Sequence, residues 1–68
     1  MDKIKYPVGT VLKNIHSGEV IVIVKIDMHA VDIYNIYYFI SQEQIRSRTY
    51  EYQINLDNLY DVIFHPED

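Results

Sequence analysis

Arginine and tyrosine side chains alternate along one stretch of the sequence, an arrangement suited to binding. The alternating residues are Arg46, Arg48, Tyr50 and Tyr52. A β-strand places every second side chain on one face, and such a face suits a protein contact, because arginine and tyrosine are enriched in binding hot spots. It also suits single-stranded nucleic acid, whose phosphates bind arginine and whose bases stack on aromatic rings. A third interpretation makes Tyr50, Tyr52 and Ile54 core residues and leaves the arginines solvated.

The sequence lacks the residue patterns typical of enzymes and metal sites. The three histidines, His16, His29 and His65, lie far apart in the chain, whereas metal ligands usually follow short fixed spacings. The only glycines are Gly9 and Gly18, so no glycine-rich phosphate loop is possible. We therefore expect a protein that is not an enzyme and that uses no metal and no cofactor.

Length and composition favour one small β domain. The chain has 68 residues and no cysteine, so neither a disulfide nor a cysteine-based zinc site stabilises it. Isoleucine, valine and tyrosine are abundant, and these residues pack well on a pleated surface. We predict a single domain over residues 1–68, with a lead-in segment at 1–9 and an acidic tail at 65–68.

Charge is distributed unevenly along the chain. The net charge is −4, with +2 in residues 1–25, −1 in residues 26–48 and −5 in residues 49–68. A nucleic-acid binder usually carries a clustered basic footprint, so this balance counts against nucleic acid as a partner. The acidic end is interpreted as a solvated strand and tail, or as a patch that docks a basic partner.

Targeting signals are missing from the sequence as given. No apolar run approaches the ~18 residues of a membrane span, and no apolar stretch of secretory type follows a basic start. We therefore expect no membrane association and a cytoplasmic location. The bias toward isoleucine, asparagine, lysine and tyrosine is typical of AT-rich coding and suggests a low-G+C bacterium or its phage, in which case the location is the host cytoplasm.

Alternation and turn residues predict five strands that would position these side chains. The predicted strands span residues 10–15, 19–27, 33–41, 45–54 and 60–64. The triplet His16-Ser17-Gly18 is typical of a tight hairpin, and the aspartate and asparagine within residues 55–59 favour a single 3-10 turn. Pro66 follows the last strand, where proline ends ladder pairing.

Three segments carry a resemblance to a known class of folds. They are Tyr-Pro-Val-Gly-Thr-Val-Leu at 6–12, the hairpin at 16–18 and Leu-Asp-Asn-Leu-Tyr-Asp-Val-Ile-Phe at 56–64. Together they resemble the SH3-like small β-barrel proteins of bacteria and phages, over nearly the whole chain and at the level of pattern. The resemblance implies an all-β small barrel of about five antiparallel strands, with one 3-10 turn before the last strand.

The same resemblance implies several kinds of function. Small SH3-like proteins include nucleic-acid binders, accessory proteins of translation and transcription, and inhibitors, and the fold does not choose among them. The chain has no tryptophan and no Ala-Leu-Tyr-Asp-Tyr-like run. The proline-peptide groove of eukaryotic SH3 domains is therefore not transferred to it.

Residues 20–24 are an unbroken run of β-branched side chains, apolar on both faces of the predicted strand. We predict that one face forms the core, with the residues Val20, Val22, Val24, Ile36 and Ile54. The other face then carries more apolar side chains than one small barrel can bury: Ile21, Ile23, Tyr37 and Phe39. A contiguous exposed apolar patch usually marks a contact surface, so we predict that these four residues bind a protein partner or a second copy in a homodimer.

These features predict a small non-catalytic binding protein, an accessory protein that modulates another protein by occupying its surface. Arg46, Arg48, Tyr50 and Tyr52 form a possible secondary contact. One alternative is a nucleic-acid-associated module that uses the arginine and tyrosine face of the fourth strand with the N-terminal lysines. Another is a structural homo-oligomer.

Overall fold

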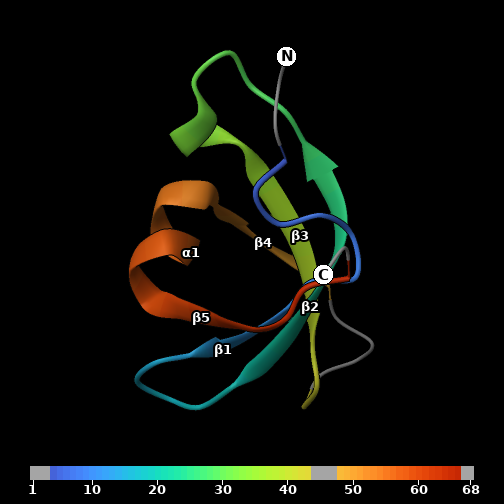
Figure 1. The fold of residues 1–68 in the computed structure, drawn as a ribbon, viewed down its shortest axis with the longest axis vertical. Helices are drawn as coiled ribbons and strands as arrows, with labels where there is room; N and C mark the ends of the chain where they lie inside the picture. The colour runs from blue at the N-terminus through green and yellow to red at the C-terminus, as the bar shows by residue number, and fades with distance from the viewer. Residues whose placement is uncertain (1–3, 44–47, 67–68) are drawn as a thin grey trace.

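The computed structural model describes residues 4–43 and 48–66, which form one antiparallel sheet of five strands (Figure 1). The strands in chain order are β1 (Val11–Asn14), β2 (Val20–Asp27), β3 (Ile36–Ser41), β4 (Arg48–Tyr52) and β5 (Tyr60–Phe64). They lie side by side in the order β4-β3-β2-β1-β5, so β4 and β5 are the two edges. A 3-10 turn, η1 (Asp32–Tyr34), precedes β3, and the helix α1 (Gln53–Leu59) joins β4 to β5.

The prediction of about five antiparallel strands is confirmed, but the prediction of a closed barrel is wrong. Among the described residues no ladder joins β4 to β5, and the helix α1 stands between them in the chain. Only one 3-10 turn was expected there, and η1 instead lies where the third strand was expected to begin. Within residues 4–43 and 48–66 no helix is long and apolar enough to cross a membrane.

The predicted hairpin between β1 and β2 is confirmed at residues 16–18. The side-chain Oδ1 of Asn14 accepts hydrogen bonds from the backbone N–H groups of His16 at 2.8 Å and Ser17 at 3.0 Å. Gly18 follows with a φ of +78°, a conformation that other residues adopt only with strain. The asparagine and the glycine therefore fix the tight turn that sets the register of β1 against β2.

A β-bulge in β2 decides which side chains reach the core. Before the bulge Ile23 pairs with Phe39 of β3, and after it Ile26 pairs with Tyr37, because the register shifts just after Ile23. One extra residue on the bulged strand reverses the alternation of its side chains. The inward positions of β2 are therefore odd-numbered before residue 24 and even-numbered after it.

The core lies on the face of the sheet covered by the lead-in segment and α1. Its buried apolar side chains are Tyr6, Leu12, Ile21, Ile23, Tyr37, Phe39 and Leu56. Ile21, Ile23 and Tyr37 are 0% exposed, and Phe39 is 7% exposed. The prediction that these four residues form an outward contact surface is therefore wrong, since they are the centre of the core.

The sequence-based choice of core residues is wrong for the same reason. Val20, Val22, Val24 and Ile36 are only half-buried. Val20 pairs with Lys13 and Val22 pairs with Val11, on the face of the sheet that points away from the core. Ile54 is 38% exposed and lies in α1, whose buried residues are Gln53 and Leu56. The two faces of the sheet are exchanged relative to the prediction.

Candidate functional site

The face of β2, β3 and β4 turned away from the core is lined by paired aromatic and basic side chains. Tyr38 pairs with Tyr50 across β3 and β4, and directly paired residues in an antiparallel ladder share one face. Their neighbours Tyr37 and Phe39 are the core residues of β3, so these rings point the opposite way. We call this surface the tyrosine face; its residues are Lys25, Ile36, Tyr38, Ile40, Arg48, Tyr50 and Tyr52.

The rings of this face contact one another in pairs. The ring centroids of Tyr38 and Tyr50 lie 6.0 Å apart, with the ring planes at 45°. Tyr34 of η1 extends the row and meets Tyr52 edge-on, at 6.4 Å and 83°. Tyr50 is 53% exposed and Tyr52 is 42% exposed. Large rings thus remain open to solvent while their neighbours fix their positions.

Tyr38 is held from two sides by charged groups of β2. Its hydroxyl donates a hydrogen bond to Asp27 Oδ2 at 3.0 Å, and this bond raises the pKa of Tyr38 above the usual value of a tyrosine. Lys25 Nζ lies 5.3 Å from the ring centroid, within the range of a cation–π interaction. The ring is therefore pre-oriented at the centre of the tyrosine face.

An apolar hollow adjoins the tyrosine face at the end of β3. Its lining residues are Val20, Val22, Ile40, Ser41 and Gln42. Ile40 pairs with Arg48 of β4, so the hollow and the basic end of the tyrosine face meet at this pair. Among the described residues, the lining of the hollow is mostly apolar and has no titratable side chain.

Sequence reasoning placed part of this surface correctly. Arg48, Tyr50 and Tyr52 share one face, as their alternation predicted, and all three are exposed. The interpretation that puts the two tyrosines in the core is wrong, and Arg46 lies outside the described residues. Sequence reasoning does not identify Tyr38 as a surface residue, because it predicts that the face shared by Tyr38, Ile36 and Ile40 forms the core.

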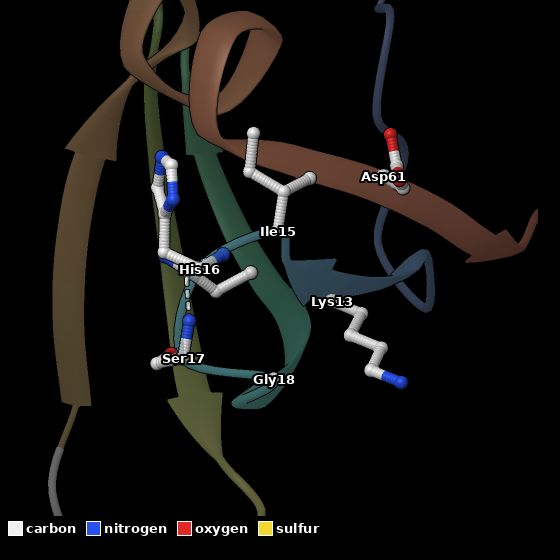
Figure 2. A pocket seen from close by; sticks show the side chains of 7 residues that line it. Lys13, Ile15, His16, Ser17, Gly18 and Asp61 are labelled. Atoms are coloured by element: carbon white, nitrogen blue, oxygen red, sulfur yellow. Dashed lines mark hydrogen bonds between the residues drawn. The ribbon is translucent and has the colours of Figure 1, made fainter.

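A second concave surface lies at the β1–β2 hairpin (Figure 2). Its lining includes Lys13, His16 and Asp61, which are the titratable groups among the described residues that line it. Figure 2 shows that these three side chains point in different directions and do not converge on one point. Among the described residues no group of three or more histidine, cysteine, aspartate or glutamate side chains is arranged to hold a metal ion. The hairpin groove therefore offers no constellation for catalysis.

A buried polar network lies on the core side of the sheet. The Tyr37 hydroxyl donates to Gln53 Oε1 at 2.7 Å, and Asn35 Nδ2 donates to the same oxygen at 3.5 Å. Asn35 Oδ1 accepts the backbone N–H of His29 at 2.7 Å. Burial raises the pKa of Tyr37. These groups satisfy one another and fix the junction of β4 with α1, so we assign them a structural role.

A second polar cluster fastens the lead-in segment to α1. The Tyr6 hydroxyl donates to Asp57 Oδ1 at 2.5 Å, and Lys5 Nζ lies 2.8 Å from the same oxygen. The Tyr6 ring packs edge-on against Tyr37 at 5.3 Å. Burial, and then the hydrogen bond to Asp57, raise the pKa of Tyr6. This cluster closes one side of the core.

Comparison of the chain with known protein families, with curated proteins and with solved structures finds no match. The tyrosine face is therefore identified as the candidate site from its geometry: exposed rings fixed by their neighbours, two cations and an adjoining apolar hollow, on a face that the core does not use.

Proposed function

We propose that this chain is a small non-catalytic binding protein whose tyrosine face docks a protein partner and modulates it by covering part of its surface. The observation that carries the proposal is the exposed Tyr50 ring, which packs against Tyr38 two pairs away from Arg48 on the same face. Tyrosine and arginine carry a large share of the energy in protein interfaces. The composition and the SH3-like resemblance favour a bacterial or phage accessory protein acting in the cytoplasm.

The fixed geometry of the face supports this proposal. Binding orders the side chains of an interface, and each flexible side chain that is ordered costs about 0.5–1.5 kcal/mol. The hydrogen bond from Tyr38 to Asp27 and the cation of Lys25 over its ring orient this side chain before a partner arrives. A partner therefore gains contact area at a reduced entropic cost.

Single-stranded nucleic acid is the second candidate. The cations of Lys25 and Arg48 stand beside rings on which bases can stack, which is the arrangement that nonspecific single-strand binders use. The net charge of −4 counts against this candidate, because long-range repulsion lowers the affinity for a phosphate backbone. We therefore rank it below a protein partner.

The test of the proposal is capture of a partner by the immobilised chain and by matched variants, with the captured protein then titrated in solution. We expect Tyr50→Ala and Arg48→Ala each to weaken its binding by about tenfold or more, as truncation of a hot-spot residue does. Phe64→Ala is the control, because Phe64 is a ring of β5 that is 56% exposed, close to the 53% of Tyr50. Equal binding by all three variants would place the contact elsewhere.

A fluorescence anisotropy titration with a labelled single-stranded oligonucleotide separates the two candidates. We expect no submicromolar binding at physiological salt. If the oligonucleotide binds with submicromolar affinity, if this affinity falls steeply with salt, and if Arg48→Ala weakens it, nucleic acid becomes the preferred candidate instead of a protein partner.

A further inference from the structure

At the open edge of β4, some backbone N–H and C=O groups point away from β3. One hydrogen bond at the end of the β3–β4 ladder shows which residues carry them. The N–H of Gln53 donates to the carbonyl of Asn35 at 2.9 Å, directly beyond the last pair of the β3–β4 ladder. Hydrogen-bonded and non-hydrogen-bonded pairs alternate along an antiparallel ladder. Counting back from Gln53, the N–H and C=O groups of Glu51 and Thr49 point to β3. The other residues of β4 point theirs to the open edge: Arg48, Tyr50 and Tyr52.

An independent contact agrees with this assignment. The N–H of Tyr52 donates to Oε1 of Glu51 at 3.2 Å, and the same carboxylate accepts Asn55 Nδ2 at 2.7 Å. An N–H bound by a side chain in this way is not directed into the β3 ladder. The Glu51 carboxylate therefore covers one end of the open edge, while no contact found among the described residues covers the N–H of Tyr50.

We propose that two copies of this chain pair antiparallel through their β4 edges, about a two-fold axis at Tyr50. Because the Tyr50 backbone points to the open edge, the N–H and C=O of Tyr50 bond to the C=O and N–H of the partner's Tyr50. This register brings all of Arg48–Tyr52 opposite the second copy's strand, with the N–H of Tyr52 exchanging the Glu51 carboxylate for the carbonyl of the partner's Arg48, whereas a shift to either side leaves part of the strand unpaired. The two sheets then join into one continuous sheet.

The side chains of β4 are complementary to themselves in this register. Arg48 lies opposite the partner's Tyr52, where a cation meets a ring. Tyr50 lies opposite the partner's Tyr50, and cross-strand aromatic pairs stabilise a sheet. On the other face Thr49 lies opposite the partner's Glu51, as donor and acceptor. No like charges are directly opposed, and each strand has one arginine and one glutamate, so its net charge is zero.

The other edge of the sheet is a poorer surface for a second copy. β5 carries Asp61 and no basic residue, so its net charge is −1. Pairing two β5 edges would bring two acidic strands together, which charge repulsion opposes. The second copy therefore pairs at β4, and the dimer joins the two tyrosine faces at Tyr50. The pairing itself does not depend on the proposed function, because it uses the backbone edge and not the binding of another protein.

The test is sedimentation velocity of the full chain over a concentration series. We expect a reversible equilibrium between one and two chains. Tyr50→Pro removes the ring of Tyr50 and an N–H that points away from β3, and proline is accepted at such edge positions, so we expect a folded chain that stays monomeric. Val62→Pro is the matched control on β5, and we expect it to dimerise as the wild type does.

Four outcomes would overturn the proposal. For the wild type, they are a chain that remains monomeric up to about millimolar concentration and assemblies larger than two chains that grow with concentration. For the variants, they are a folded Tyr50→Pro chain that still dimerises and a folded Val62→Pro chain that no longer dimerises. Should Tyr50→Pro fail to fold, hydrogen exchange of the wild type gives the answer. The Tyr50 amide must then become about tenfold or more slower to exchange as concentration rises through the dimer range; an unchanged rate rejects the pairing.

Discussion

Tyr37 and Tyr38 are neighbours on β3 and point to opposite faces of the sheet. Tyr37 is 0% exposed, and its hydroxyl donates a hydrogen bond to the buried Gln53. The hydroxyl of Tyr38 donates a hydrogen bond to Asp27 on the outer face. Both pKa values are raised, that of Tyr37 by burial and that of Tyr38 by its hydrogen bond. Two identical side chains thus differ in role because they lie on different faces. The inner face carries the core of the domain, and the outer face leaves large rings exposed to solvent.

The largest expected effect comes from placing a charge on each face in turn. Ile23→Glu buries an unpaired carboxylate among core side chains, and such a charge costs several kcal/mol. That cost is comparable with the whole stability of a small domain, about 5 kcal/mol, so we expect Ile23→Glu to unfold the chain. Val22→Glu places the same charge on the outer face, and we expect it to remain folded by far-UV circular dichroism. If Val22→Glu unfolded the chain and Ile23→Glu stayed folded, the assignment of the inner and outer faces of β2 would be wrong.

The next effect tests the polar network of the inner face. Gln53→Ala leaves the hydroxyl of Tyr37 and the amide of Asn35 without their shared acceptor. An unsatisfied buried polar group costs about 1–3 kcal/mol, which urea denaturation measures. Gln42→Ala, at an exposed glutamine, is the control and should change the free energy of unfolding by less than about 0.5 kcal/mol. Equal losses in both variants would mean that the network contributes nothing of its own.

Tyr6→Phe tests the cluster that closes the core. It removes the hydrogen bond to Asp57, and a hydrogen bond to a charged group contributes about 1.5–3 kcal/mol. The pKa of Tyr6 is raised in the folded chain, so its contribution is full below about pH 10, the unfolded value, and is lost as pH rises further. We expect the wild type to lose more stability than Tyr6→Phe between neutral and alkaline pH. Parallel pH curves would contradict this linkage.

The smallest effect is expected for Val22→Ala, which is compared with the same substitution at its neighbour Ile21 in β2. Val22 is half-buried on the outer face, so we expect Val22→Ala to cost about 1 kcal/mol or less. Ile21 is 0% exposed, and Ile21→Ala should cost about 2–5 kcal/mol through the cavity it leaves. Denaturant midpoints of both variants measure the difference. Similar midpoint shifts would mean that the two faces of β2 are buried to the same extent.

The strands were predictable because their signals are local. Alternation, β-branched residues and the His16-Ser17-Gly18 triplet predict the five strands and the hairpin without any knowledge of packing. The helix α1 was missed, because Tyr50, Tyr52 and Ile54 continue the alternation of β4 into it. Its formation depends instead on the burial of Gln53 and Leu56, one turn apart on the side of α1 that faces the core.

The facing of the sheet was not predictable, because it depends on distant residues. An unbroken apolar run has no period, so residues 20–24 do not reveal which side is inward. The inner face is the one that Tyr6 and Leu56 cover, and these residues are far from β2 in the chain. For the candidate site, the alternation of Arg48, Tyr50 and Tyr52 predicted a shared face, whereas their exposure followed only from the side on which the core lies.

The β-bulge after Ile23 divides β2 into two segments. The inward side chains are odd-numbered in the first segment and even-numbered in the second. Ahead of the bulge the odd-numbered residues must be apolar, and behind it Ile26 takes the inward position. A substitution at residue 24 changes one side chain. Deletion of that residue shifts the alternation of side chains by one position, which turns those of one segment to the opposite face of the sheet. The length of β2 at residue 24 is therefore a stronger constraint on the fold than the identity of the side chain there.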